Sequence, residues 1–344
     1  MYLLPLFIGG TGRCGTTVLG RTLSLHRDIF TIPFESRFIV DPHGVVNLVQ
    51  ALSINWDQYH GHYAVLKFKE LMKELYPSKL RYLYKIGAGK IYPKLHIAPP
   101  RYYFTIDGKW KDEEFFDYKT QPFSVLISRD KFERLLNEFL SKIIIREYAG
   151  YWQGYGTEIG PRMYVTRRFE YREILKITRQ FVEGIMIEAA NRFNARIIVD
   201  HTPTNINHVL FLKDLFPEMK FIHIYRDPRD VVSSFKRHTW GGNSAQDAVP
   251  IIKGTLMKWE EEKKNMPRES YLEIALEDLV KDKESVLKRI CDFLGIGFDV
   301  NMLKMDLSKS HSGRWKRDLS KEEIELVERE LGWFMKEKGY QFSE

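Results

Sequence analysis

Cysteine and long apolar runs are scarce in this chain of 344 residues, and each shortage excludes a class of protein. The two cysteines, Cys14 and Cys291, cannot make a disulfide framework and lack metal-ligand spacing, which argues against a disulfide-stapled secreted fold and a cysteine-rich zinc site. No stretch reaches the roughly 18 to 20 uncharged apolar residues of a transmembrane helix. The first residues also lack the basic and small-residue features of a secretory signal. We therefore expect a protein of a reducing compartment, the cytoplasm, without a transmembrane segment.

The composition is that of a globular protein with a basic surface. Hydrophobic residues make up 44% of the chain and aromatic residues 14%, which suffices for a packed core and excludes disorder as the whole description. Lys and Arg number 53 against 46 Asp and Glu, which leaves a net charge of +7. This balance favours an anionic partner, and charge alone leaves nucleotides, nucleic acids, sulfated sugars and acidic peptides open.

Strand patterns alternate with helix patterns along most of the chain. The expected strands are 6–8, 28–33, 196–200, 220–225 and 270–276, and the expected helices are 16–26, 45–52, 65–75, 171–193, 205–216, 228–238, 248–264, 277–294 and 319–338. Pro5 has no N–H for a strand ladder, so we expect the paired part of the first strand to begin at about Leu6. The alternation predicts an α/β fold, a mostly parallel sheet of about five strands with helices on both faces.

Residues 79–168 differ in character from the rest of the chain. They are rich in Tyr, Lys and Pro, with one clear helix at 130–148. We expect an insertion or lid within a single domain that spans 1–344. A subdomain that only packs is equally favoured, because aromatic clusters are more often core than ligand platform.

A glycine-rich turn joins the first expected strand to the first expected helix. Such a turn aims unpaired N–H groups and the positive end of the helix at one point, which suits a phosphate or sulfate. Gly10, Gly15 and Thr17 nearly complete a Walker pattern, but Thr16 stands where the phosphate-binding Lys belongs. Arg13 supplies a basic group within the loop instead, and its planar guanidinium suits two oxygens of a tetrahedral anion. A tight turn without a ligand is the alternative.

A second basic constellation begins at the end of the strand expected at 220–225. Asp227 is placed as a helix N-cap and Pro228 as the first helical residue, so a plain helix start explains those two. It does not explain Arg226 before them or Ser234 two turns into the helix. These two side chains can converge on a second anion in the crevice at the carboxyl ends of the strands.

Together the two constellations resemble the sulfotransferases that use 3'-phosphoadenosine 5'-phosphosulfate (PAPS). Residues 12–17 look like the family's 5'-phosphosulfate loop, Pro-(Lys/Arg)-Ser-Gly-(Thr/Ser)-Thr, with Gly in place of Pro and Cys in place of Ser. Arg226 and Ser234 match the pair that holds the 3'-phosphate, and segments 200–203, 277–296 and 313–317 agree in order and spacing. The resemblance implies a P-loop-like three-layer fold, a PAPS donor with PAP as product, and a binding loop of Gly12, Arg13, Cys14, Gly15, Thr16 and Thr17.

Glu35 is the candidate catalytic base. The chain is most similar to the bacterial and tyrosylprotein-type branch, whose base is a Glu shortly after the first helix, and Glu35 stands at the matching position. Sulfuryl transfer to a hydroxyl needs a group that accepts its proton, and a carboxylate beside the anion loop suits that role. An isolated Glu would otherwise be interpreted as a solvated surface residue.

His201 departs from the family pattern. Residues 200–203 resemble Asp-Lys-(Thr/Asp)-Pro, in which Lys stabilises the leaving oxygen, and here His takes its place. A protonated His201 would serve with a pH dependence near its ordinary pKa of about 6.5. Two alternatives stay open: Arg13 suffices alone, or His201 only packs at a strand end.

Residues 313–315 look like the family's late Gly-x-Trp segment, in a flexible loop that closes over the nucleotide. The resemblance implies that Gly313, Arg314 and Trp315 contact the donor, with Arg314 and Lys316 as phosphate partners and Trp315 as a stacking or packing residue.

We predict a PAPS-dependent sulfotransferase that needs no metal and does not bind nucleic acid. A P-loop kinase is the first alternative, disfavoured by Thr16 and by the lack of an evident Mg²⁺ carboxylate. A non-catalytic polyanion or nucleic-acid binder that uses the basic, aromatic residues of 79–168 is the second. The acceptor stays open among sugar, lipid, small molecule, phenol and peptide tyrosine, and 79–168 is the region expected to choose among them.

Overall fold

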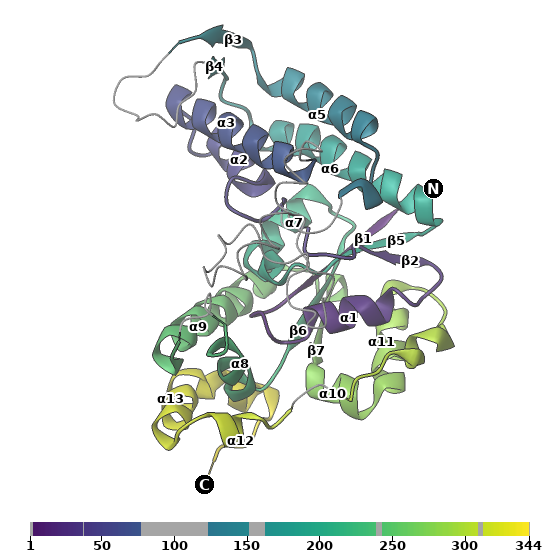
Figure 1. Ribbon diagram of the computed structural model, residues 1–344, viewed down its shortest axis with the longest axis vertical. Helices are drawn as coiled ribbons and strands as arrows, with labels where there is room; N and C mark the ends of the chain where they lie inside the picture. Colours follow the sequence, from purple (N-terminus) through teal and green to yellow (C-terminus); the bar gives the residue numbers. More distant parts are fainter. Residues whose placement is uncertain are drawn as a thin grey trace, which may run out of the picture. The chain divides into compact units, whose positions relative to one another are not determined.

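The structure is a computed structural model that describes residues 3–36, 38–76, 123–150, 162–238, 243–308 and 312–343 (Figure 1). Its internal contacts divide the chain into two compact units. Unit 1 comprises Met1–Thr31 and Asn194–Glu344, and unit 2 comprises Ile32–Phe193. Much of the predicted insertion at 79–168 lies outside the described residues, so its role as a lid stays a prediction.

Unit 1 is built on a five-stranded sheet of order β2-β5-β1-β6-β7 (Figure 1). All four strand pairs are parallel, which confirms the predicted fold class. The strands are β1 (Leu4–Gly9), β2 (Ile29–Thr31), β5 (Ile197–Asp200), β6 (Lys220–Tyr225) and β7 (Tyr271–Ala275). Because every strand runs the same way, their carboxyl ends meet at one edge, where open α/β sheets bind ligands.

Helices cover both faces of this sheet. Leu6 and Ile8 of β1 point to the face packed against α1 (Thr16–Leu23) and α11 (Lys283–Leu294). Phe7 of β1 and Phe221 of β6 point to the other face, where α7 (Val209–Leu215) and α9 (Ala245–Glu262) lie. Phe7 contacts Phe216, which directly follows α7, and Phe221 stacks on Trp259 of α9. Burying each such side chain stabilises the fold by about 1.5–3 kcal/mol.

A small helical layer adjoins the sheet and carries the end of the chain. Helices α8 (Pro228–Phe235), α12 (Trp315–Asp318) and α13 (Lys321–Lys338) share an apolar cluster with α9. The predicted capping box at Ser320 and Glu323 is present, and Gly339 ends α13 with φ of 77°. These caps satisfy N–H and C=O groups that the helix itself leaves open.

Pro5 lies inside the central strand β1, so the prediction that pairing begins at Leu6 was wrong. Leu4 already donates its N–H to Arg196 O at 2.9 Å, on the β5 side. Alternate residues of a strand present their backbone groups to opposite sides, so the nitrogen of Pro5 faces β6. Pairing with β6 starts only at Leu6, opposite Lys220, and the missing N–H costs no ladder bond.

Two helices predicted as single elements are divided. The helix expected at 277–294 is α10 (Leu276–Lys281) followed by α11, because Asp282 leaves the helical conformation and accepts a hydrogen bond from Ser285 N as the cap of α11. The helix expected at 205–216 begins as a 3-10 helix over Pro203–His208 before α7. In both places a residue that can cap or start a helix interrupts the apolar pattern.

Unit 2 is mainly helical. It contains α2 (Val45–Leu52), α3 (Gln58–Leu75), α5 (Arg129–Ile143), α6 (Tyr171–Phe193) and an antiparallel pair, β3 (Arg146–Ala149) and β4 (Arg162–Val165). The helix predicted to reach residue 148 ends at Ile143, because Ile144 turns extended and Ile145 N bonds to Val165 O at 2.9 Å. Across both units, no helix within the described ranges is long and apolar enough to span a membrane.

Candidate functional site

The glycine-rich loop leaves the sheet at Gly9 and enters α1 at Thr16. Gly12, Arg13 and Gly15 have φ of 80°, 56° and 104°, the left-handed region in which a side chain is strained. Gly15 is the N-cap of α1, and the first turn has neither a side-chain cap nor an acidic residue. The positive end of α1 thus has no negative group of its own, and an anion would complete it.

Cys14 lies beneath this loop. The side chain is fully buried, and burial raises the pKa of its thiol above the ordinary value. A Cβ placed on Gly10 would collide with the Cys14 sulfur, so the thiol fills the space that the glycine leaves. Cys14 is a neutral packing residue in this structure, since reactive cysteines need thiolate character and access.

The structure brings the loop and the second constellation together. Arg13 Nε donates to Ser234 Oγ at 3.0 Å, and Arg226 donates to Arg13 O at 3.5 Å. Arg226 and Ser234 are 6% and 3% exposed. Two sets of residues more than 200 positions apart in sequence therefore form one site at the carboxyl edge of the sheet.

The start of α8 is built as predicted. Asp227 caps the helix by accepting Arg229 N at 2.9 Å, and Pro228 is its first residue. Asp230, in the first turn, lies 3.3 Å from the guanidinium of Arg226 and is almost fully buried.

Residues 313–315 are bonded to α8. Gly313 N and Trp315 N donate to the two carboxylate oxygens of Asp230 at 2.7 Å and 3.0 Å. The Trp315 ring is buried, with the guanidinium of Arg229 3.8 Å from its centroid. Of the two predicted roles for Trp315, stacking and packing, this geometry supports packing.

Positive charge exceeds negative charge where these segments meet. We define the arginine cluster as four arginines and two aspartates: Arg13, Arg226, Arg237, Arg314, Asp230 and Asp318. Asp318 pairs with Arg237 at 2.6 Å and with Arg314 at 3.2 Å. Burial, followed by repulsion from Arg237 and Arg226, lowers the pKa of Arg314. An anionic ligand would relieve this repulsion, so the cluster fits a phosphate.

Sequence reasoning missed three members of the cluster: Arg237, Asp230 and Asp318. Two of them carried a signal, because Asp230 follows Arg226 by four positions and Asp318 follows Arg314 by four. That spacing brings opposite charges together where a helix begins, since Arg226 precedes α8 and Arg314 is the N-cap of α12.

His201 follows β5 and is 2% exposed. Its ring packs on α1, where a Cβ at Gly20 would come within 2.9 Å of His201 Cδ2. The preceding Asp200 accepts Thr202 N at 2.9 Å and orders the strand end. His201 is therefore a buried residue at a strand end, and its role beside the leaving oxygen stays a prediction.

Glu35 belongs to unit 2 and comes four residues after β2 ends. The side chain is partly buried, between the fully buried Phe34 and Ser36. Its neighbour Phe34 packs against Phe123, with ring centroids 6.2 Å apart. The segment that carries the predicted base is therefore anchored in the core of unit 2.

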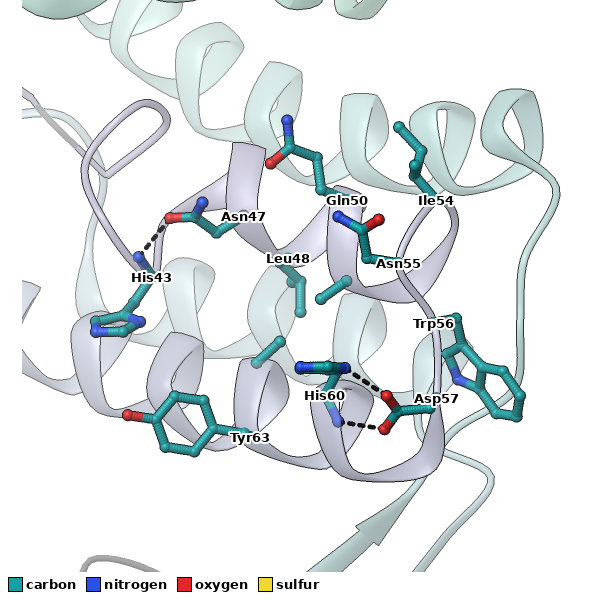
Figure 2. Close-up of a pocket in the computed structure, with 12 residues that line it drawn as sticks. His43, Asn47, Leu48, Gln50, Ile54, Asn55, Trp56, Asp57, His60 and Tyr63 are labelled. Carbon is teal, nitrogen blue, oxygen red and sulfur yellow. Dashed lines mark hydrogen bonds and ion pairs between the residues drawn. The ribbon is translucent and has the colours of Figure 1, made fainter.

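Unit 2 also contains a hollow of about 660 Å³ between α2 and α3 (Figure 2). Figure 2 shows two polar pairs on its wall: His43 N donates to Asn47 at 2.8 Å, and Asp57, the cap of α3, pairs with His60. None of the residues that line it is Lys or Arg, and none is a predicted site residue. Its chemistry does not suit a nucleotide with several phosphates.

Comparisons with known proteins place part of the chain in one family. The sulfotransferase family matches residues 157–300, which include Arg226 and Ser234 but not the glycine-rich loop. Sulfotransferase 2A1 of Rattus norvegicus is 32% identical over 132 residues, 33% of this chain and 44% of that protein. Sulfotransferase 2A6 of the same organism is 30% identical over 153 residues, 40% and 51% of the two chains.

The chain thus spans about half the length of the curated relatives that it matches. Among solved structures, a sulfotransferase domain from the curacin biosynthetic pathway is 16% identical, with a TM-score of 0.48 over 100% of this chain and 99% of that one. The predicted resemblance is confirmed for part of the chain, although not for a particular branch: residues 157–300 match the sulfotransferase family.

Proposed function

We propose that this protein transfers a sulfuryl group from PAPS to a hydroxyl-bearing acceptor. The observation that carries the proposal is the contact between Arg13 of the glycine-rich loop and Ser234 of α8, within a cluster that has more guanidinium groups than carboxylates. PAPS carries roughly four negative charges at its two ends, counting close to two per phosphate monoester. A site with adjacent anion-binding parts matches such a donor.

Each group of residues in the proposed site has a separate role. Residues 12–17 hold the 5'-phosphosulfate at the open end of α1, while Arg226, Ser234 and Arg314 hold the 3'-phosphate. The acceptor oxygen attacks sulfur, the bond from sulfur to the bridging oxygen breaks, and PAP leaves with the electron pair. Glu35 takes the proton of the acceptor hydroxyl, and Arg13 stabilises charge on the leaving oxygen, with His201 as a second candidate.

Two finer proposals concern the cellular compartment and the branch of the family. Cys14 and Cys291 are both free and buried, which fits the predicted reducing compartment. The position of Glu35 in the sequence is the basis on which we propose the bacterial and tyrosylprotein-type branch. The acceptor class is a matter for direct screening with radiolabelled donor.

Nucleotide-dependent melting separates this proposal from the alternatives. Under sulfuryl transfer, PAP raises the melting temperature without Mg²⁺, because a ligand that binds only the folded state stabilises it. Stabilisation by ATP that requires Mg²⁺, with none by PAP, would instead support a kinase. Salt-sensitive oligonucleotide binding that PAP does not affect would support a polyanion binder. Transfer of the labelled sulfuryl group from PAPS to an acceptor then demonstrates the reaction itself.

A further inference from the structure

Asp230 joins two segments of the candidate site that are distant in sequence. Its side chain is 1% exposed. One carboxylate oxygen, Oδ2, accepts Gly313 N at 2.7 Å and lies 3.3 Å from the guanidinium of Arg226, while Oδ1 accepts Trp315 N at 3.0 Å. A single carboxylate thus contacts both the end of β6 and the turn before α12.

The partners of Asp230 are what a buried carboxylate requires. A buried charge without partners costs several kcal/mol, and here one guanidinium and two N–H groups compensate it. The left-handed conformation of Gly313, with φ of 77°, belongs to the turn that directs the N–H groups of residues 313 and 315 toward this carboxylate. Loss of the carboxylate would remove both bonds to this turn and the ion pair with Arg226 at the same time.

We propose that Asp230 is a positioning residue that holds Arg226 and the turn bearing Arg314 in register, so that both guanidinium groups meet the 3'-phosphate of the donor. The inference rests on the proposed function. Asp230 is itself negative, so its charge opposes binding of an anion. Its benefit to the site must come from the geometry that it imposes.

A charge effect and a positioning effect of Asp230 predict opposite outcomes for Asp230→Asn. The substitution removes a negative charge beside the phosphate site, and if only charge mattered it would tighten PAP binding. It also places an amide N–H₂ where N–H donors need an acceptor, so a positioning role predicts weaker binding. We expect the affinity for PAP to fall about tenfold or more, and the affinity for adenosine 5'-phosphosulfate, which lacks the 3'-phosphate, to change less than about threefold. Unchanged or tighter PAP binding, or equal losses for both nucleotides, overturns the proposal.

Asp299→Asn is the matched control. Asp299 is also buried and accepts two backbone N–H groups, those of Arg27 at 3.2 Å and Asn301 at 3.0 Å, but it lies outside the arginine cluster. This variant is expected to lower stability without changing the preference for PAP. If Asp230→Asn does not fold, Asp230→Glu keeps the charge but displaces it by one methylene, and we expect it to reduce the same preference.

Hydrogen exchange separates this inference from the proposed function. Without any nucleotide, Asp230→Asn should speed amide exchange at residues 312–318, and Asp299→Asn should not. If Asp230→Asn speeds exchange but the unchanged protein does not bind PAP, the structural role of Asp230 is supported and PAPS is refuted as the donor. Unchanged exchange in a protein that does bind PAP would refute the positioning role.

Discussion

The arginine cluster of unit 1 and the hollow of unit 2 are both polar, yet they are built in opposite ways. In the cluster, Arg226 and Asp230 are buried, Arg314 and Asp318 are largely buried, and each carboxylate has partners that are distant in sequence. In the hollow, the pairs are local, His43 with Asn47 and Asp57 with His60, and most of these side chains are exposed. Of these two arrangements, only the first has more positive than negative side chains, which is what a phosphate site requires.

The difference suggests how the chain distributes its chemistry. In the proposed function, unit 1 binds the anionic donor, while unit 2 contributes the candidate base Glu35 and contains a hollow without Lys or Arg in its lining. The predictions below test this division, beginning with the one that we expect to have the largest effect.

Glu35→Gln should reduce turnover by about a hundredfold or more, the range in which general base catalysis contributes. The change keeps the size of the side chain but removes its ability to accept the proton, so PAP affinity should not change. Turnover with radiolabelled donor and calorimetric binding of PAP measure the two effects. Glu70→Gln is the control, since Glu70 is an exposed residue of unit 2 that pairs with Lys67 at 3.1 Å. An active Glu35→Gln enzyme would remove Glu35 from the mechanism and break the proposed division.

Arg226→Ala should weaken PAP binding by about ten- to 150-fold, the loss expected for charge-assisted hydrogen bonds. Adenosine 5'-phosphosulfate should lose much less. Because the change leaves Asp230 without its cation, folding is checked by melting, and Arg226→Lys supplies a milder variant that keeps the charge but not the planar fork.

Two controls accompany this measurement. Arg196→Ala removes an exposed arginine of unit 1 that pairs with Asp28 at 2.6 Å, and Asn55→Ala alters the hollow. Both should leave PAP affinity within about twofold, as surface changes usually do. Equal losses for both nucleotides in Arg226→Ala would contradict the 3'-phosphate assignment. A loss in Asn55→Ala would place the donor in the hollow.

The sequence predicted the elements whose signals are local. The bounds of α2, α6 and β6 agree with the expected ones, because each apolar pattern ends where a cap, turn or charge begins. The Ser320 capping box was visible for the same reason, since its partners are three residues apart. Local patterns also singled out Arg13, Arg226 and Ser234, which the structure brings together.

What the sequence did not predict depends on contacts between distant residues. Ile145 joins a strand ladder with Val165 and thereby ends α5 early, which no pattern near residue 145 indicates. Packing of His201 against Gly20 of α1 likewise joins two segments that are distant in sequence. The bond from Gly313 N to Asp230 spans 83 positions, so a pairwise spacing rule cannot find it.

The smallest effect that we expect is a change in the pH dependence of unfolding, which we test with one histidine from each unit. Burial, with repulsion from Lys258, lowers the pKa of His208 in unit 1 to about 4, whereas an unfolded chain has about 6.5. Between these values the unfolded state binds more protons, so stability is lost as pH falls from about 6.5 toward 4. Since His208 keeps some solvent access, we expect a loss of about 2 kcal/mol or less from this residue.

Melting of His208→Gln between about pH 7 and pH 5 should therefore show a flatter decline than the unchanged protein, by a few degrees at the acidic end. His43→Gln is the matched control, because His43 lies exposed in the hollow and its loss should leave the slope as it was. An equal flattening in both variants would mean that an exposed histidine of unit 2 affects acid stability as much as the half-buried His208 of unit 1. Desolvation of His208 would then not be the cause of the loss of stability in acid.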